Sequence, residues 1–123
     1  QDPAFGIRQL LDISMRALSA AINDTTTAVA CVDWLGVILL RLVTRHVESP
    51  VREHEGRVVV LAAGATYEGL LRFALDELRH NAAGNISVLG RLLEMLGLLG
   101  EAAPDEGRRA LVREQVELVH EVV

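Results

Sequence analysis

Apolar residues recur at spacings of three and four along most of this 123-residue chain, which predicts helices. The first predicted helix begins near Pro3, because Asp2 can cap its free amides and a proline at the first helical position loses no hydrogen bond. Its apolar pattern stops at Ile22, where Asn23 and Asp24 favour a turn. The residues of its apolar face are Ile7, Leu11, Ser14, Leu18 and Ile22.

The second predicted helix runs from a cap at Asp24 or Thr25 to about Val47 and is apolar nearly all round. A helix of this kind lies at the centre of a bundle or in a subunit interface. Two charged residues, Asp33 and Arg41, interrupt it, so no unbroken run of about 18 apolar residues occurs. We therefore expect a buried central helix here and no membrane span.

The pattern changes to short strands after Ser49-Pro50, which ends the second helix. Two short stretches, residues 51–53 and 57–61, flank His54-Glu55-Gly56, and Gly56 can take the left-handed turn position. This segment predicts a short β-hairpin inserted into the helical chain.

Three more helices are predicted in the second half of the chain. One runs from a cap at Thr66 to about Asn81, and the next from a cap at Asn85 to a loop that begins at Gly100. The last begins at Pro104 and reaches the end of the chain. The prediction is one all-α domain over residues 1–123, a bundle of about five helices with a hairpin insertion.

Two features of these helices predict contacts. Gly90 and Gly97 lie one heptad apart on the fourth helix, and each costs about 1 kcal/mol relative to alanine. We expect a neighbouring helix to approach closely there. On the first helix, Asp12 is four residues from both Arg8 and Arg16 and can pair with either.

Composition narrows the class of protein. Half of the residues are hydrophobic but only 3% are aromatic, so the core must be built from aliphatic side chains, which favours packed helices. A net charge of −5 argues against a nucleic-acid partner, which needs a basic surface. The single Cys31 excludes an internal disulfide. The chain has no starting Met and no secretion signal, and we expect it to be a fragment of a longer protein.

A pair of Glu-x-x-His segments is the pattern that could bind metal. Glu77 and His80 lie on the third predicted helix, and Glu117 and His120 on the fifth. Di-iron bundles use two such pairs together with a carboxylate from each of two other helices. The carboxylates nominated for those places are Asp33 and Glu94.

Helix geometry argues against that site. Glu77 lies six residues before the turn centred near residue 83 and Glu94 eleven after it, an offset of roughly 7 Å along the helix axis. We therefore expect no cofactor and keep the metal site as an alternative.

Two polar turns are the other candidate site. Each precedes a helix, whose free amides can bind an anion, and together they would form a polar pocket if the fold brings them to the same end. The alternative is that they only cap their helices. The candidate residues are Asn23, Asp24 and Thr26 in the first turn, Arg79, Asn81 and Asn85 around the second, and Arg91 beyond it.

Catalytic motifs are missing from the sequence. Cys31 lies in the most apolar helix, where a thiol is usually an inert core residue, and no nucleophile elbow or glycine-rich phosphate loop is present. The chain is therefore expected not to be an enzyme.

Two segments resemble a known family. Residues 2–10, 17–19, 22–24 and 26–28 are similar to the soluble domain of predicted bacterial membrane proteins, the domain of unknown function numbered twenty-two fifty-four. Gly84-Asn85, Val88 and the run Arg91-Leu92-Leu93-Glu94 are similar too. The family usually has Ser-Pro-Gly where this chain has Ser19-Ala20-Ala21, and a proline at the position of Thr25. This turn is therefore less rigid here than in the family.

The resemblance implies transmembrane helices upstream and a soluble domain at the membrane, with no established reaction and no catalytic residues. The leading hypothesis is a non-enzymatic domain on the cytoplasmic side of a bacterial inner membrane. It would associate with further copies of itself or regulate the transmembrane part of the same chain. The alternative is a bundle that binds a metal or a small anion through the residues given above.

Overall fold

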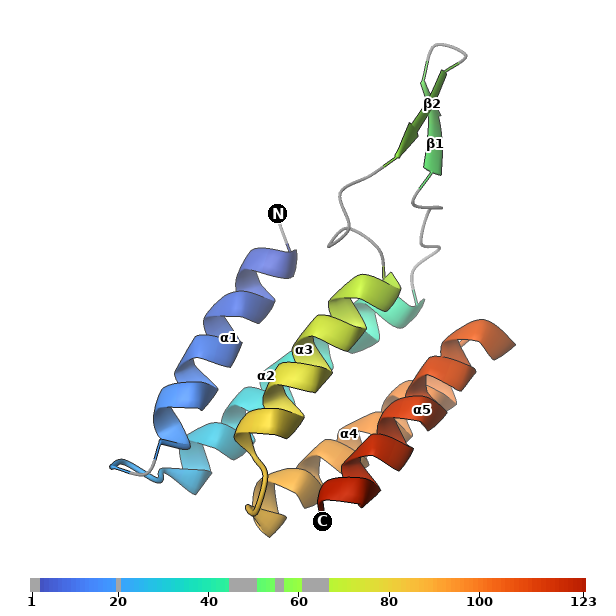
Figure 1. The fold of residues 1–123 in the computed structure, drawn as a ribbon. Coiled ribbons are helices and arrows are strands. Elements are labelled where there is room, and N and C mark those ends of the chain that lie inside the picture. The colour runs from blue at the N-terminus through green and yellow to red at the C-terminus, as the bar shows by residue number, and fades with distance from the viewer. Residues whose placement is uncertain (1–2, 20, 45–50, 55–56, 61–66) are drawn as a thin grey trace.

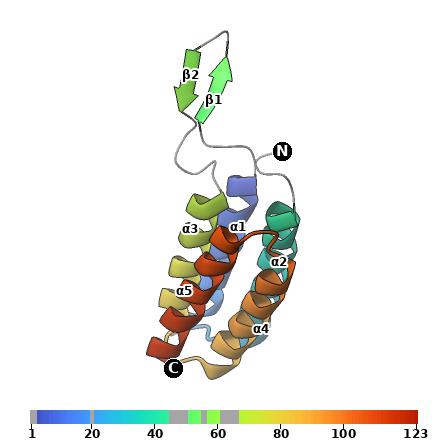
Figure 2. The ribbon, with the colours of Figure 1, turned by 90° about the vertical axis from the view of Figure 1, so that its right-hand side faces the viewer.

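The computed structural model describes residues 3–19, 21–44, 51–54, 57–60 and 67–123. Five helices in these residues confirm the all-α class (Figure 1). Each contacts two neighbours in the cyclic order α1, α2, α4, α5, α3, and α2 also touches α3 across the ring (Figure 2). The helices are α1 (Pro3–Ala17), α2 (Thr25–Thr44), α3 (Tyr67–Asn81), α4 (Ile86–Ala102) and α5 (Glu106–Val122).

The core inside this ring is aliphatic, as the composition predicts. Leucine dominates it, because leucine combines high helix propensity with a large buried surface. The three aromatic side chains whose burial is described, Phe5, Trp34 and Phe73, are all exposed. The leucines that are fully buried are Leu35, Leu39, Leu71, Leu75, Leu78, Leu89, Leu92, Leu96 and Leu99.

Helix α1 ends five residues before the predicted end. The chain reverses after Ala17, whose carbonyl accepts a hydrogen bond from the amide of Asp24 at 2.5 Å. Asn23 takes a left-handed conformation with φ of 46°, which asparagine tolerates better than most residues. The prediction that Ile22 continues the apolar face is therefore wrong, and its side chain is 60% exposed.

Helix α2 is more ambiguous than the sequence pattern indicated. Its stretch Thr25–Val43 has a mean hydropathy of 1.8 and is long and apolar enough to cross a membrane. Our expectation that nothing here could span was too strict, since two charges in 19 residues do not rule out a span. The core helix of a bundle meets the same criteria, and 39% of this stretch is buried among the other helices. Leu35 and Leu39 point into that core.

Two short strands lie between α2 and α3. Strands β1 (Val51–His54) and β2 (Arg57–Val60) pair antiparallel, with Val51 opposite Val60. Both views show them extending away from the bundle at the end where α2 finishes and α3 begins (Figures 1 and 2). The predicted turn residue Gly56 and the predicted caps Asp2 and Thr66 lie outside the described residues.

The boundary between α4 and α5 also differs from the prediction. Helix α4 continues past Gly100 to Ala102. Asp105 then caps α5 by accepting a 2.8 Å hydrogen bond from the amide of Arg108. Pro104 therefore lies before the helix and does not begin it. Asp105 takes the cap position, where aspartate is one of the preferred residues.

The predicted close approach at Gly90 and Gly97 is wrong. A Cβ atom added at either position would meet nothing within 4 Å, so both glycines face open space. The close helix contact is at Gly36 on α2, where an added Cβ would lie 2.9 Å from Cγ of Met95 on α4. Gly36 thus lets α2 and α4 approach each other.

Candidate functional site

The two predicted polar turns meet at one end of the bundle. In Figure 1 the α1–α2 and α3–α4 connections lie side by side, at the end away from the strands. They border a hollow of about 410 Å³. Its polar lining residues are Asn23, Thr25, Asn81, Asn85 and Ser87.

Asn85 joins the two turns. Its Oδ1 accepts a 3.1 Å hydrogen bond from the amide of Val88 and so caps α4, as predicted. Its Nδ2 donates to Oγ1 of Thr25 at 3.1 Å. This bond holds the N-termini of α2 and α4 together, so the positive ends of both helix dipoles face this end of the bundle.

Asp24 caps α2 beside the hollow. Its Oδ1 accepts from the amide of Thr27 at 3.1 Å, and its Oδ2 accepts from the Thr27 hydroxyl at 2.6 Å. These bonds, together with one from the amide of Thr26, hold the pKa of the carboxyl below its usual value. The carboxylate is therefore engaged by its own helix, and the side chain of Thr26 is exposed to solvent.

Asn81 has a polar atom without a partner. Its Nδ2 is buried and makes no hydrogen bond within the described part of the chain. A buried donor left in this state costs about 1–3 kcal/mol. Asn81 also lines the hollow. The burial of its amide nitrogen is therefore a cost at this end of the bundle that no contact within the described residues offsets.

The two predicted arginines lie elsewhere. Arg79 donates from NH1 to Oε1 of Gln115 at 2.8 Å and from NH2 to Oδ1 of Asp76 at 2.9 Å. Arg91 is held by Asp33 on the outer side of α2. Neither arginine lines the hollow, and the described residues that do line it are all uncharged.

The Glu-x-x-His residues do not gather. Glu77, His80, Glu117 and His120 are all exposed. Among the described residues, no three His, Cys, Asp or Glu side chains are placed to hold a metal ion. The metal site stays a prediction that this geometry does not support.

The buried contact of Gln115 was not foreseen from the sequence. This side chain on α5 is 1% exposed, and besides accepting from Arg79 it donates from Nε2 to Asp76 at 3.4 Å. Its place among the apolar residues of α5, three positions after Val112 and four before Val119, was the available signal. A buried glutamine at helical spacing with core residues indicates a polar contact between helices.

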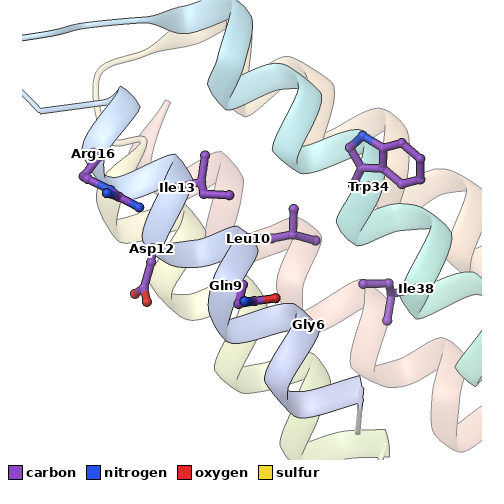
Figure 3. A pocket seen from close by; sticks show the side chains of 8 residues that line it. All are labelled: Gly6, Gln9, Leu10, Asp12, Ile13, Arg16, Trp34 and Ile38. Atoms are coloured by element: carbon purple, nitrogen blue, oxygen red, sulfur yellow. The ribbon is translucent and has the colours of Figure 1, made fainter. Parts of the chain in front are cut away.

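A groove between α1 and α2 was also missed. It has a volume of about 520 Å³. Figure 3 shows Leu10 and Ile13 directed from α1 toward α2 and Ile38 facing them from α2. The ring of Trp34, which also lines the groove, lies over α2. Trp34 is 62% exposed and is the single tryptophan of the chain. The sequence did not reveal this surface because an all-round apolar helix gives no sign of which face the bundle leaves open.

Charged residues of α1 border the same groove. Asp12 points away from α2 in Figure 3, and the side chain of Arg16 runs back along α1. The predicted pairing of Asp12 with Arg8 or Arg16 is not seen in the part of the chain that the structure describes, where Arg8 instead lies 5.3 Å from the ring centroid of Phe73. One negative and one positive side chain are thus left open to another molecule.

The burial of Cys31 agrees with a core thiol. The side chain lies inside the bundle, and burial raises the pKa of its thiol. A raised pKa suppresses the reactive thiolate, so this cysteine is a small core residue.

Comparison with known proteins places the chain in a family of predicted membrane proteins. Residues 1–97 match the family described as Predicted membrane protein (DUF2254). Uncharacterized proteins of Mycobacterium tuberculosis and Mycobacterium bovis are 32% identical to 97% of the chain, which spans 23% of their length. No solved structure matches. The chain therefore belongs to this family of predicted membrane proteins, for which no function is known.

Proposed function

We propose that this chain is a soluble, non-catalytic helical domain that assembles copies of a bacterial inner-membrane protein on its cytoplasmic side. The observation that carries the proposal is the double role of α2. One face of this helix fills the core through Leu35 and Leu39, while the outer face exposes Trp34 and Val37. An exposed apolar face of this kind indicates a contact with another molecule.

The family supports the membrane setting of the proposal. The chain spans 23% of its curated relatives, so most of such a protein lies outside this domain. Asp33 on α2 forms an ion pair with Arg91 on α4, and both side chains are about half exposed. Because a charge inside a bilayer is costly, this pair favours a place for α2 in the folded bundle and not across a membrane. Both facts favour a domain that folds beside the membrane.

The oligomeric state tests assembly directly. Light scattering after size exclusion and native mass spectrometry would be run on the 123-residue chain over a range of concentrations. The proposal expects whole multiples of 13.4 kDa that grow with concentration. A strict monomer would contradict it. A reporter fused directly after Val123 within the longer membrane protein would test the cytoplasmic side.

The second candidate function is binding of a small polar or anionic ligand in the hollow between the two turns. The buried amide nitrogen of Asn81, which has no partner in the described part of the chain, favours it. A protein retains such an energetic cost more readily where the group serves a binding site. Thermal shift with phosphate, sulfate and acetate would test it, with Asn81→Leu as the variant. A site would be supported if one of these anions raises the melting temperature of the natural chain but not that of the variant.

Metal analysis of the same sample addresses the alternative metal site. Iron, zinc or manganese that disappears from a variant with both His80→Ala and His120→Ala would support that site. Metal content unchanged by the two substitutions would end it.

A further inference from the structure

We propose that the groove between α1 and α2 is part of a two-fold contact between two copies of this chain, in which each copy covers Trp34 of the other. This inference rests on the proposed self-association and names its surface. In a two-fold contact the same patch on both copies must be self-complementary. The patch therefore has to offer apolar side chains that a second copy of the same patch can cover.

The apolar part of the groove meets this requirement. Trp34 projects with 62% of its side chain exposed, beside Ile13 and Val37, each 40% exposed. The hollow of about 520 Å³ is lined by Leu10, Ile13 and Ile38. A tryptophan is a common anchor in such contacts because it buries a large surface at low conformational cost.

The charges of α1 supply the complementarity that favours a second copy. Asp12 and Arg16 have no ion pair within the described residues, and they lie one helical turn apart. If two α1 helices cross antiparallel about an axis level with residue 14, Asp12 of each copy faces Arg16 of the other. Two equivalent ion pairs then form, and they fix the orientation of the contact.

A lipid surface is a poorer fit to the same groove. The chain carries a net charge of −5, which anionic headgroups repel. The neighbouring carboxylate of Asp33 is already neutralised by Arg91, so the border of the groove offers Arg16 together with Asp12 and no basic cluster. The balanced pair suits an identical partner better than a charged membrane.

Trp34 is also the probe that tests the proposal. As the single tryptophan, it reports its own surroundings by fluorescence. We expect its emission to shift to shorter wavelength as concentration rises, over the same range in which the mass doubles. Ile13→Asp should remove both changes. Val122→Asp, at a position of matched exposure on α5 (39%), should leave both unchanged.

Charge exchange tests the antiparallel pairing. Asp12→Arg places two arginines against two arginines across the axis, and Arg16→Asp places two aspartates against two aspartates. Each single variant should dimerise about tenfold more weakly or worse, because like charges then oppose each other. A mixture of the two variants should form a heterodimer. The variant that carries both substitutions should form a homodimer with the same affinity as the natural chain.

The outcomes separate this inference from the proposed function. A dimer by mass with unchanged tryptophan emission would overturn the groove contact and leave self-association standing. A monomer at every concentration would overturn both. A shift in emission that requires vesicles of anionic lipid, without any change in protein mass, would replace the second copy by a lipid surface. Failure of the mixed variants to pair would overturn the antiparallel geometry.

Discussion

Arg91 on α4 donates hydrogen bonds to both carboxylate oxygens of Asp33 on α2. Nε of Arg91 lies 2.7 Å from Oδ1 and NH2 lies 2.9 Å from Oδ2. This fork geometry is the strongest form of an arginine–carboxylate contact. The pair joins the two helices that also approach each other at Gly36.

The first prediction concerns this pair. The hydrogen bond from Arg91 lowers the pKa of Asp33 below its usual value of 3.8. Its contribution to stability is therefore present above pH 3.8 and is lost as pH falls through the lowered pKa. We expect Asp33→Asn to lower the urea midpoint slightly at pH 7, less so in high salt because both partners are half-exposed. The variant and the natural chain should converge once the pH falls below the lowered pKa of Asp33.

The control for that measurement is Glu101→Gln, which removes one exposed negative charge that has no ion pair among the described residues. It should leave the urea midpoint unchanged. Equal behaviour of the two variants at pH 7 would show that the Arg91 contact adds nothing to stability.

The second prediction compares three glycines by urea denaturation. Gly90→Ala and Gly97→Ala should each stabilise the fold by about 1 kcal/mol, because both sites face open space and alanine favours helix. Gly36→Ala gains the same propensity but presses on Met95, and overpacking costs about 1–3 kcal/mol. We expect a net loss of about 1 kcal/mol. Stabilisation by all three substitutions would contradict the close contact of α2 and α4.

The third prediction separates the two asparagines of the polar end. Asn85→Ala removes the cap of α4 and the bond to Thr25, and should cost about 1 kcal/mol or somewhat more. Asn81→Leu removes a buried donor that has no partner among the described residues, and should be neutral or stabilising by up to about 1 kcal/mol. Thermal and urea denaturation of both variants check this. A large loss from Asn81→Leu would mean that its amide has a partner in solution.

The fourth prediction concerns the buried glutamine. Gln115→Leu leaves Arg79 without its acceptor on α5, and we expect a loss of about 1–3 kcal/mol in the free energy of unfolding. A double-mutant cycle with Arg79→Met isolates the pair. The second substitution should add little once Gln115 is gone, and fully additive losses would argue against a direct interaction.

Helix number and most of the core followed from the sequence because aliphatic periodicity is strong and aromatics are few. The capping role of Asn85 followed as well, since a side chain that bonds its own backbone acts locally. The early end of α1 did not follow, because the bond between Ala17 and Asp24 depends on the whole turn. The position of Gly36 against Met95 depends on how two distant helices pack, which spacing along the chain does not contain.

The sequence likewise predicted one part of the candidate site and missed another. The meeting of Asn23, Asn81 and Asn85 could be stated only as a condition on the fold, and the bundle meets that condition. Arg79 and Arg91 were assigned to the pocket from their nearness in sequence, but carboxylate and amide partners on other helices hold them away from it. The groove at Trp34 became visible only when the buried face of α2 was known.

The cyclic order of the helices has a consequence for the order of assembly. Helices α1 and α2 form one hairpin of neighbours along the chain, and α4 and α5 form another, so both can collapse early. Helix α3 closes the ring between α1 and α5 through contacts that are distant in sequence, among them Arg8 with Phe73 and Arg72 with Glu114. We therefore expect local unfolding of the native domain to begin at the contacts of α3 with α1 and α5. Amide hydrogen exchange should then be faster in α3 than in α2 or α4.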